Sequence, residues 1–269
     1  NRIGGVGVEY VEESETKAWI RFPHPRWIYM GTAICGIPDT VGQGYVRGWY
    51  GHNGVSLGNP NLGFVCTSQD THAGYGFSGY FMEYDHTLST DERARFVEGE
   101  IMPQFDPDRA PELDSNIWTK GRLEKARRNY AMEYIRSGLM ELIPMIGVDR
   151  TSAVGDITAQ LIGRQFYPEL LEILGFNPAD RSLNAFSRFM VAMATAHNND
   201  VVITHESGRM TITQTGWRLG RDMADFPPVI FDVWNALWAG CLCAHDRMRH
   251  LKVVKRPINA GDSVIWSIT

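Results

Sequence analysis

The stretch Leu251-Lys252-Val253-Val254, followed after Ala260-Gly261-Asp262 by Val264-Ile265-Trp266-Ser267-Ile268, decides the fold of the C-terminal part. β-branched and aromatic residues dominate both apolar segments, as is typical of strands. Glycine tolerates positive φ and aspartate bonds its own backbone, so the Gly-Asp pair favours a turn between them. The sequence therefore predicts a closing β-hairpin, directly after a helix over Val233–Arg249.

The segments upstream extend this pattern. Apolar residues recur at helical spacing, and Gly175 follows where a helix C-cap would lie. The expected apolar face of this helix consists of Ile157, Leu161, Ile162, Phe166, Leu170, Leu171 and Leu174. A second helix should carry Phe186, Phe189, Met190 and Met193 on one face. Two β-branched strands, 201–206 and 210–215, are joined by Ser207-Gly208 and predict another hairpin.

The order helix, helix, hairpin, helix, hairpin over residues 126–269 resembles the 4-vinyl reductase-type small-molecule-binding domain and its relatives, the L-2-amino-thiazoline-4-carboxylic acid hydrolases. The resemblance implies an α+β fold with an antiparallel sheet, flanking helices and an apolar ligand. Many such domains close a structural metal site at places that this chain fills with Phe231, Val254, Pro257 and Ile265. None of these side chains can ligate zinc, so we expect no structural metal and no cofactor, while a catalytic divalent metal stays open.

The N-terminal part differs in composition, since it holds most of the glycine and tyrosine and shows little helical periodicity. We predict a β- and loop-rich region over residues 1–115 that contributes to the pocket. Residues 116–269 should form the α+β small-molecule-binding domain, beginning with a long helix from Asn116 to Gly138. We see no sharp linker, so the two parts should pack as one compact unit.

Composition excludes several classes of protein. A chain of 269 residues with 43% hydrophobic and 21% charged residues is typical of a soluble globular protein. It has no apolar run long enough to cross a bilayer, and a net charge of -5 argues against a nucleic-acid surface. Four scattered cysteines indicate a reducing compartment. We therefore expect a cytoplasmic protein that binds neither nucleic acid nor membrane.

Cysteine and histidine concentrate in one predicted helix, as Cys241, Cys243 and His245. Cys241 and His245 make a feasible i, i+4 pair, whereas Cys241 and Cys243 point to different faces and cannot grip one ion. We expect the cysteines to be small buried hydrophobes of the helix core.

The segment Gly44–Asn61 packs aromatic rings, amides and an imidazole between glycines. Glycines let a backbone approach a ligand closely, and loops are where binding and catalytic groups concentrate. Within it, His52 would be the general base or polarise the ligand, and Asn53 would orient it or donate to an oxyanion. A pair of irregular turns explains the same pattern equally well.

Further candidates lie on two predicted strands. His205 keeps the phase of Val201 and Ile203, which would place it inward, and with Glu206 it would form a second acid-base pair. Glu83 and Asp85 share a face with an aromatic residue, and an apolar setting would raise a carboxyl pKa, although a water-facing rim is the simpler reading. The remaining candidate ligand contacts are Arg47, Trp49, Tyr50, Trp234 and Trp238.

These residues predict an enzyme that acts on a small aromatic or heterocyclic compound in an enclosed apolar pocket. The hydrolase branch of the resemblance implies C–N or C–S ring opening by an activated water, or related lyase chemistry. The alternative is a non-catalytic module that binds or senses aromatic compounds and hydrocarbons. The expected partner is this small molecule, and the 8 Trp and 12 Phe leave apolar surface that favours a homodimer.

Overall fold

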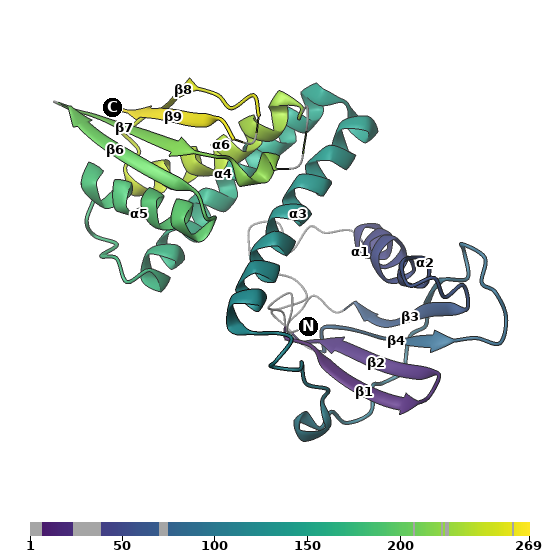
Figure 1. Cartoon of the computed structure of the whole chain (residues 1–269). Helices are drawn as coiled ribbons and strands as arrows, with labels where there is room; N and C mark the ends of the chain where they lie inside the picture. Colours follow the sequence, from purple (N-terminus) through teal and green to yellow (C-terminus); the bar gives the residue numbers. More distant parts are fainter. Residues whose placement is uncertain are drawn as a thin grey trace. The chain divides into compact units, whose positions relative to one another are not determined.

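The computed structural model describes residues 7–23, 39–69, 75–206, 208–221, 223, 226–259 and 261–269. The chain divides into two compact units, Asn1–Arg127 and Arg128–Thr269. Helices and mostly antiparallel sheets make up both units, so the predicted α+β class is confirmed (Figure 1). The division lies inside the long helix α3 (Lys120–Ile146), whereas the sequence placed it ahead of this helix.

The N-terminal unit is built on a five-stranded sheet in the order β1-β2-β4-β3-β5. The strands are β1 (Glu9–Ser14), β2 (Lys17–Phe22), β3 (Leu62–Gln69), β4 (Phe77–Glu83) and β5 (Ala94–Phe96). All neighbours pair antiparallel except β5, which runs parallel to β3. Phe64 and Val65 belong to different apolar layers, because successive side chains of a strand point to opposite faces.

Short helices pack against the layer that contains Phe64. Helix α1 (Asp39–Tyr45) continues into a π-helix, η2 (Val46–Tyr50), and α2 (Asn53–Ser56) follows. The rings of Tyr50 and Phe64 stack with centroids 4.5 Å apart. The described part of the glycine-rich segment is thus mostly helical, where the alternative reading expected irregular turns. Along the chain, a 3-10 turn, η3 (Pro107–Arg109), follows β5 and precedes α3.

The C-terminal unit contains a four-stranded antiparallel sheet in the order β6-β7-β9-β8. Its strands are β6 (Asp200–Glu206), β7 (Arg209–Thr215), β8 (Leu251–Lys255) and β9 (Ser263–Ile268), so both predicted hairpins are confirmed. The inward residues of the central strands are fully buried: Met210, Ile212, Val264, Trp266 and Ile268. The other face is open, since Val202 is 63% and Val254 is 58% exposed.

The two hairpin turns are made by different means. Gly208 has φ 73°, the left-handed conformation that glycine tolerates. Gly261 does not adopt positive φ, which corrects the expected role of this glycine. Instead, Asp262 Oδ2 accepts hydrogen bonds from the N–H groups of Ile258 at 2.9 Å and Asn259 at 2.8 Å. These bonds lower the pKa of Asp262, so the carboxylate rather than the glycine shapes the closing turn.

Three helices lie on one side of this sheet (Figure 1). They are α4 (Val148–Ile173), α5 (Leu183–Ala196) and α6 (Pro228–His245), and a 3-10 turn, η4 (Arg218–Gly220), precedes α6. Gly175 ends α4 with φ 69°, while Phe176 N–H donates to the carbonyl of Leu171 at 2.8 Å. This Schellman arrangement confirms the predicted C-cap.

Small residues let α4 and α6 approach closely. A Cβ on Gly163 would lie 2.2 Å from the carbonyl oxygen of Leu237, and one on Gly240 would lie 2.3 Å from that of Gln160. The buried residues of α4 are Thr151, Gly155, Ala159, Gly163, Tyr167 and Leu171. The predicted apolar face is therefore wrong over the first part of the helix, where Ile157 is 61% exposed. A close crossing selects small side chains rather than the largest apolar ones.

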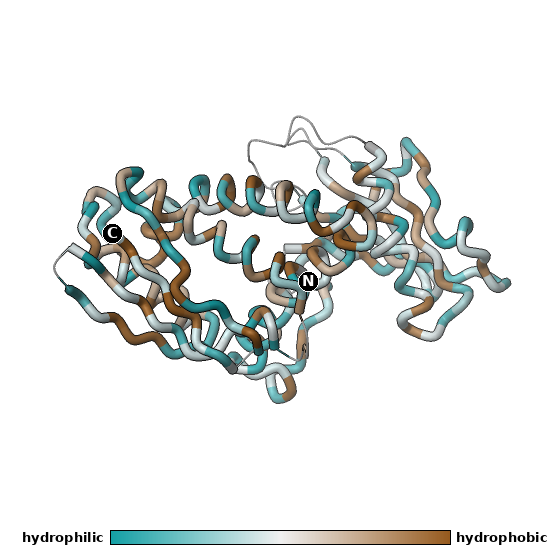
Figure 2. Tube along the Cα trace, turned by 90° about the horizontal axis from the view of Figure 1, so that it is seen from above, coloured by the Kyte–Doolittle hydropathy of each residue, from teal (hydrophilic) through white to brown (hydrophobic). Residues whose placement is uncertain are grey.

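Apolar residues are spread in short stretches through both units (Figure 2). In the described part of the chain, no helix is both long and apolar enough to cross a membrane. Helix α6 is strongly apolar because it is buried on most sides, with Phe231, Trp234, Trp238 and Leu242 all in the core.

We expect Gly163→Ala to lower the free energy of unfolding by about 1–3 kcal/mol, because the added methyl must separate two packed backbones. Gly138→Ala on α3 is the matched control, since a Cβ there meets no atom within 4 Å. That change should stabilise by up to about 1 kcal/mol, because alanine favours helix over glycine. Urea denaturation of both variants measures the difference, and equal values would contradict the close crossing.

Candidate functional site

The candidates of the glycine-rich segment occupy different environments. Arg47 and Trp49 are exposed on η2, whereas Tyr50 is buried in the aromatic layer and serves the core. His52 is the exposed N-cap residue of α2, and Asn53 begins that helix half-buried. The segment therefore presents an arginine, an indole and an imidazole at the surface of the N-terminal unit.

Glu83 and Asp85 are exposed, as the water-facing alternative predicted. Asp85 Oδ1 lies 2.9 Å from Nδ1 of His86, and both side chains are solvent-accessible. This hydrogen bond lowers the pKa of Asp85, so the expected rise from an apolar setting does not occur there.

His205 and Glu206 are exposed at the end of β6. His205 pairs with the fully buried Met210 and keeps the inward phase of Val201 and Ile203, which pack on the core. Its exposure corrects the expected inward placement. The end of this edge strand projects beyond the helices (Figure 1), so the correct phase does not bury the imidazole.

Trp234 and Trp238 lie in the core of the C-terminal unit and meet a histidine that sequence reasoning missed. The two indoles are one helical turn apart, nearly perpendicular, with ring centroids 5.2 Å apart. Their residues are 7% and 3% exposed. The half-buried ring of His197 packs on both, at 5.4 Å from Trp234 and 6.2 Å from Trp238. We call these three residues the His197 cluster.

The end of α5 turns His197 toward α6. Asn198 has φ 59°, and its N–H donates to the carbonyl of Thr195 at 2.9 Å. Asn199 N–H donates to the carbonyl of Ala194 at 2.9 Å, which completes a Schellman motif with asparagine in the left-handed position. Asparagine is the usual substitute for glycine there, so the Asn-Asn pair was a readable signal for this helix end.

The environment of His197 is cationic. Burial, followed by the positive charges of Arg218 and Arg128, lowers the pKa of His197 to about 4. The imidazole is therefore neutral at physiological pH. Burial and the charges of Arg128 and Arg221 also lower the pKa of Arg218. Within the described residues, neither Arg128 nor Arg218 forms an ion pair, and Arg218 donates to Asn129 Oδ1.

Two buried indole N–H groups add unused donors. Nε1 of Trp217 and Nε1 of Trp238 have no hydrogen-bond partner in the described part of the chain. Trp217 immediately precedes Arg218, and Trp238 belongs to the His197 cluster. A buried donor without a partner costs about 1–3 kcal/mol, so each of these two groups calls for an explanation, such as a bound water or ligand.

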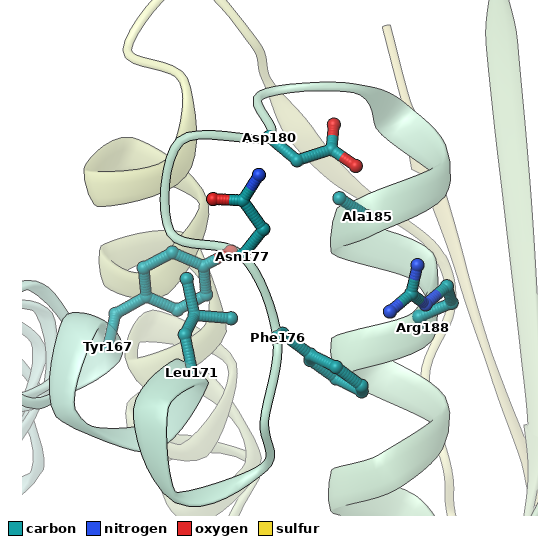
Figure 3. A pocket seen from close by; sticks show the side chains of 7 residues that line it. All are labelled: Tyr167, Leu171, Phe176, Asn177, Asp180, Ala185 and Arg188. Atoms are coloured by element: carbon teal, nitrogen blue, oxygen red, sulfur yellow. The ribbon is translucent and has the colours of Figure 1, made fainter.

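A second candidate place is a cavity of about 40 Å³ between the end of α4 and the start of α5 (Figure 3). It is lined by Tyr167, Leu171, Phe176, Asn177, Asp180, Ala185 and Arg188. A water needs about 10–15 Å³ of such volume, whereas pockets for drug-sized molecules measure about 300–1,000 Å³. The cavity therefore has room for a few waters and is too small for the predicted aromatic substrate.

The histidine beside this cavity is fully satisfied. The Tyr167 hydroxyl donates to Nδ1 of His245 at 2.7 Å, and the opposite ring nitrogen donates to the carbonyl of Ser182 at 3.0 Å. The carbonyl can only accept, so Nε2 carries the proton. Arg181 also donates to the carbonyl of His245 at 3.0 Å. His245 therefore joins α4, α6 and the connection to α5 as a structural residue.

Cys241 lies 1% exposed in the same core, and burial raises its pKa to about 12. Its thiol stays protonated at physiological pH. Cys241 thus behaves as the small buried hydrophobe that the sequence predicted, while Cys243 is half-buried. No group of three or more potential metal ligands occurs among the described residues.

Comparisons with known proteins do not assign the chain to a family. No family model matches the sequence, and no curated protein matches it. Among solved structures, the chain is similar to a trafficking protein particle complex subunit 3 from Naegleria fowleri, solved covalently bound to palmitic acid. The identity is 13%, the match covers 52% of this chain and 95% of that chain, and the TM-score is 0.43. This similarity is too low to support a conclusion about fold or function.

The depressed pKa of His197 predicts a pH dependence of stability. As the pH falls from 6.5 to about 4, His197 becomes protonated in the unfolded chain but stays neutral in the folded protein. Stability is therefore retained above pH 6.5 and lost progressively below it. We expect the Tm of the wild type to fall more steeply over this range than that of His197→Gln. His52→Gln, at an exposed site, should keep the wild-type slope, and parallel curves for wild type and His197→Gln would contradict the prediction.

Proposed function

We propose that the C-terminal unit binds a small, flat aromatic or heterocyclic molecule at the His197 cluster. The observation that supports this most directly is a half-buried, neutral imidazole packed on two buried indoles. Aromatic faces of this kind favour stacking of flat rings, worth about 0.5–1.5 kcal/mol per pair beyond the area buried. His197 is the member that reaches solvent, so a ligand meets its ring first.

The chemistry of the cluster favours binding over catalysis. A general base works best with a pKa near the operating pH, whereas the pKa of His197 lies at about 4. The groups that act on this imidazole are indoles and arginines, and none of them is a proton acceptor. This proposal therefore follows the non-catalytic alternative, which the resemblance to 4-vinyl reductase-type domains also supports.

Calorimetric titration with 2-naphthol and 2-naphthoate tests the proposal. Both are flat two-ring compounds, and at least one should bind saturably to the wild type. His197→Ala should weaken that binding about tenfold, since a lost stacking contact costs on the order of 1 kcal/mol. His86→Ala removes an exposed imidazole and should bind as the wild type does. Absence of saturable binding of both compounds refutes the proposal, as does unchanged affinity in His197→Ala.

A second candidate function is the expected hydrolase or lyase activity, with His52 as base and Asn53 as its partner. The observation that favours it is the π-helix Val46–Tyr50, which ends just ahead of the exposed His52. π-helical turns are frequently found at functional sites. His52 and Asn53 lie in the N-terminal unit, so this activity would belong to that unit.

His52→Ala separates the catalytic role from a structural one. The side chain is exposed, so we expect the free energy of unfolding to change by less than about 0.5 kcal/mol. Turnover should fall about a hundred- to ten-thousand-fold if His52 is a general base. The assay follows loss of ring absorbance as a C–N or C–S bond opens. A variant that keeps full turnover, or one that unfolds, assigns a structural role.

The expected homodimer remains part of the proposal. Large apolar side chains stay exposed along α4, namely Val154, Ile157, Leu161 and Ile162. Large apolar side chains that gather on the exposed side of one helix commonly mark an interface, and self-association would cover them. Light scattering at micromolar concentration decides the point. A dimer that Ile157→Glu dissociates supports it, and a wild-type monomer refutes it.

A further inference from the structure

We infer that two copies of the chain pair through helix α4 in antiparallel directions, with Leu161 of each copy at the two-fold axis. The inference rests on the proposed homodimer and adds to it the direction of the two helices, their register and the residues that fix both. Two features of α4 support it, namely the pattern of its exposed residues and the charges at the ends of that pattern.

Exposed residues form one stripe along α4. They follow each other at steps of three or four positions, which keeps them on one face of an α-helix. We call this set the α4 stripe, and it consists of Arg150, Val154, Ile157, Leu161, Gln165, Pro168 and Glu172. None of them belongs to the residues of α4 that are buried.

The middle of the α4 stripe is apolar but does not serve the core of its own unit. Val154 is 53%, Ile157 is 61% and Leu161 is 44% exposed. None of the three is among the residues that form the apolar core of the C-terminal unit or pack against it. Their side chains are therefore available to cover, and be covered by, the same surface of a second copy.

The α4 stripe is symmetric about Leu161. Arg150 and Glu172 each lie eleven positions from Leu161, and Val154 and Pro168 each lie seven positions from it. In a two-fold symmetric pair, each residue of one copy meets a counterpart whose own contact is the same in reverse. An antiparallel second copy centred on Leu161 thus places Val154 opposite Pro168 and Arg150 opposite Glu172, on both sides of the axis.

The charges at the two ends select the antiparallel direction. Arg150 and Glu172 lie about 33 Å apart along α4, at about 1.5 Å per residue, so they cannot pair within one chain. Neither forms an ion pair with another described residue. Antiparallel copies bring opposite charges together at both ends. Parallel copies would place arginine against arginine and glutamate against glutamate, and like charges across an interface are costly.

A row of polar residues on one flank of the α4 stripe is hydrogen-bonded within the chain. Arg164 donates to Oε1 of Gln160 at 3.3 Å, and Nε2 of Gln160 donates to Oδ2 of Asp156 at 2.9 Å. Residues four positions apart are neighbours on a helix surface, so these three form a continuous line. The line carries one positive and one negative charge, and it adds no net charge beside the apolar contact.

Cysteine cross-linking tests the position of the axis. In Leu161→Cys the two thiols should face each other, and a disulfide requires Cβ atoms about 3.5–4.5 Å apart. Mild oxidation with copper–phenanthroline should convert most of this variant into a covalent dimer on a non-reducing gel. Ile162→Cys is the matched control, because Ile162 is equally exposed, at 43%, but lies about 100° further around the helix. It should remain as little cross-linked as the wild type.

Charge reversal tests the register. Arg150→Glu should weaken the dimer about tenfold, because it replaces two attractive contacts by two repulsive ones. Glu172→Arg should weaken the dimer to a similar extent. The double variant Arg150→Glu/Glu172→Arg restores opposite charges and should return the Kd to within about threefold of the wild type. Analytical ultracentrifugation measures the Kd of each variant.

The outcomes separate this inference from the homodimer on which it rests. A wild-type monomer overturns both and leaves the α4 stripe to another partner. If the wild type is a dimer but Leu161→Cys does not cross-link, the arrangement is overturned and the homodimer stands. The same holds if both single charge reversals keep the wild-type Kd, or if the double variant is no tighter than they are. Circular dichroism confirms that each variant is folded.

Discussion

The close crossing of α4 and α6 is the constraint on which the C-terminal unit depends. Gly163 and Gly240 bring one backbone within the space that a side chain would fill on the other. Because α6 is held there, Trp234 and Trp238 are presented to the end of α5, where His197 meets them. The same crossing turns the large apolar residues of α4 outward. The close crossing of α4 and α6 therefore accounts for both the aromatic cluster and the exposed apolar face of α4.

Two histidines in this core show how the environment divides structural from functional side chains. Both ring nitrogens of His245 form hydrogen bonds, one with Tyr167 and one with the carbonyl of Ser182, so neither is free to bind a ligand. The imidazole of His197 makes no hydrogen bond with the described residues, and its ring packs on two indoles. The sequence had singled out His245 because it follows two cysteines in a helix. Neighbours in sequence proved a poorer guide than neighbours in space.

Local signals account for what the sequence predicted correctly. β-branched runs with short connections indicated both hairpins, and Gly175 marked the end of α4 because left-handed backbone is needed there. The failures arose where a distant segment decides the outcome. Ile157 lies on the outer face because the close approach of α6 allows only small residues on the inner one. His205 has the inward phase but is exposed near the end of an edge strand. Periodicity describes one element and cannot report what covers it.

The candidate site was half-predictable for the same reason. Aromatic residues in an apolar helix indicated Trp234 and Trp238, but His197 comes from the end of α5, far away in sequence. Two features of the cluster lower the stability of the fold. Burial keeps the imidazole of His197 neutral, and Nε1 of Trp238 is a buried donor without a partner in the described part of the chain. A flat ring that also accepts a hydrogen bond would meet both groups, the face of the imidazole and the N–H of the indole.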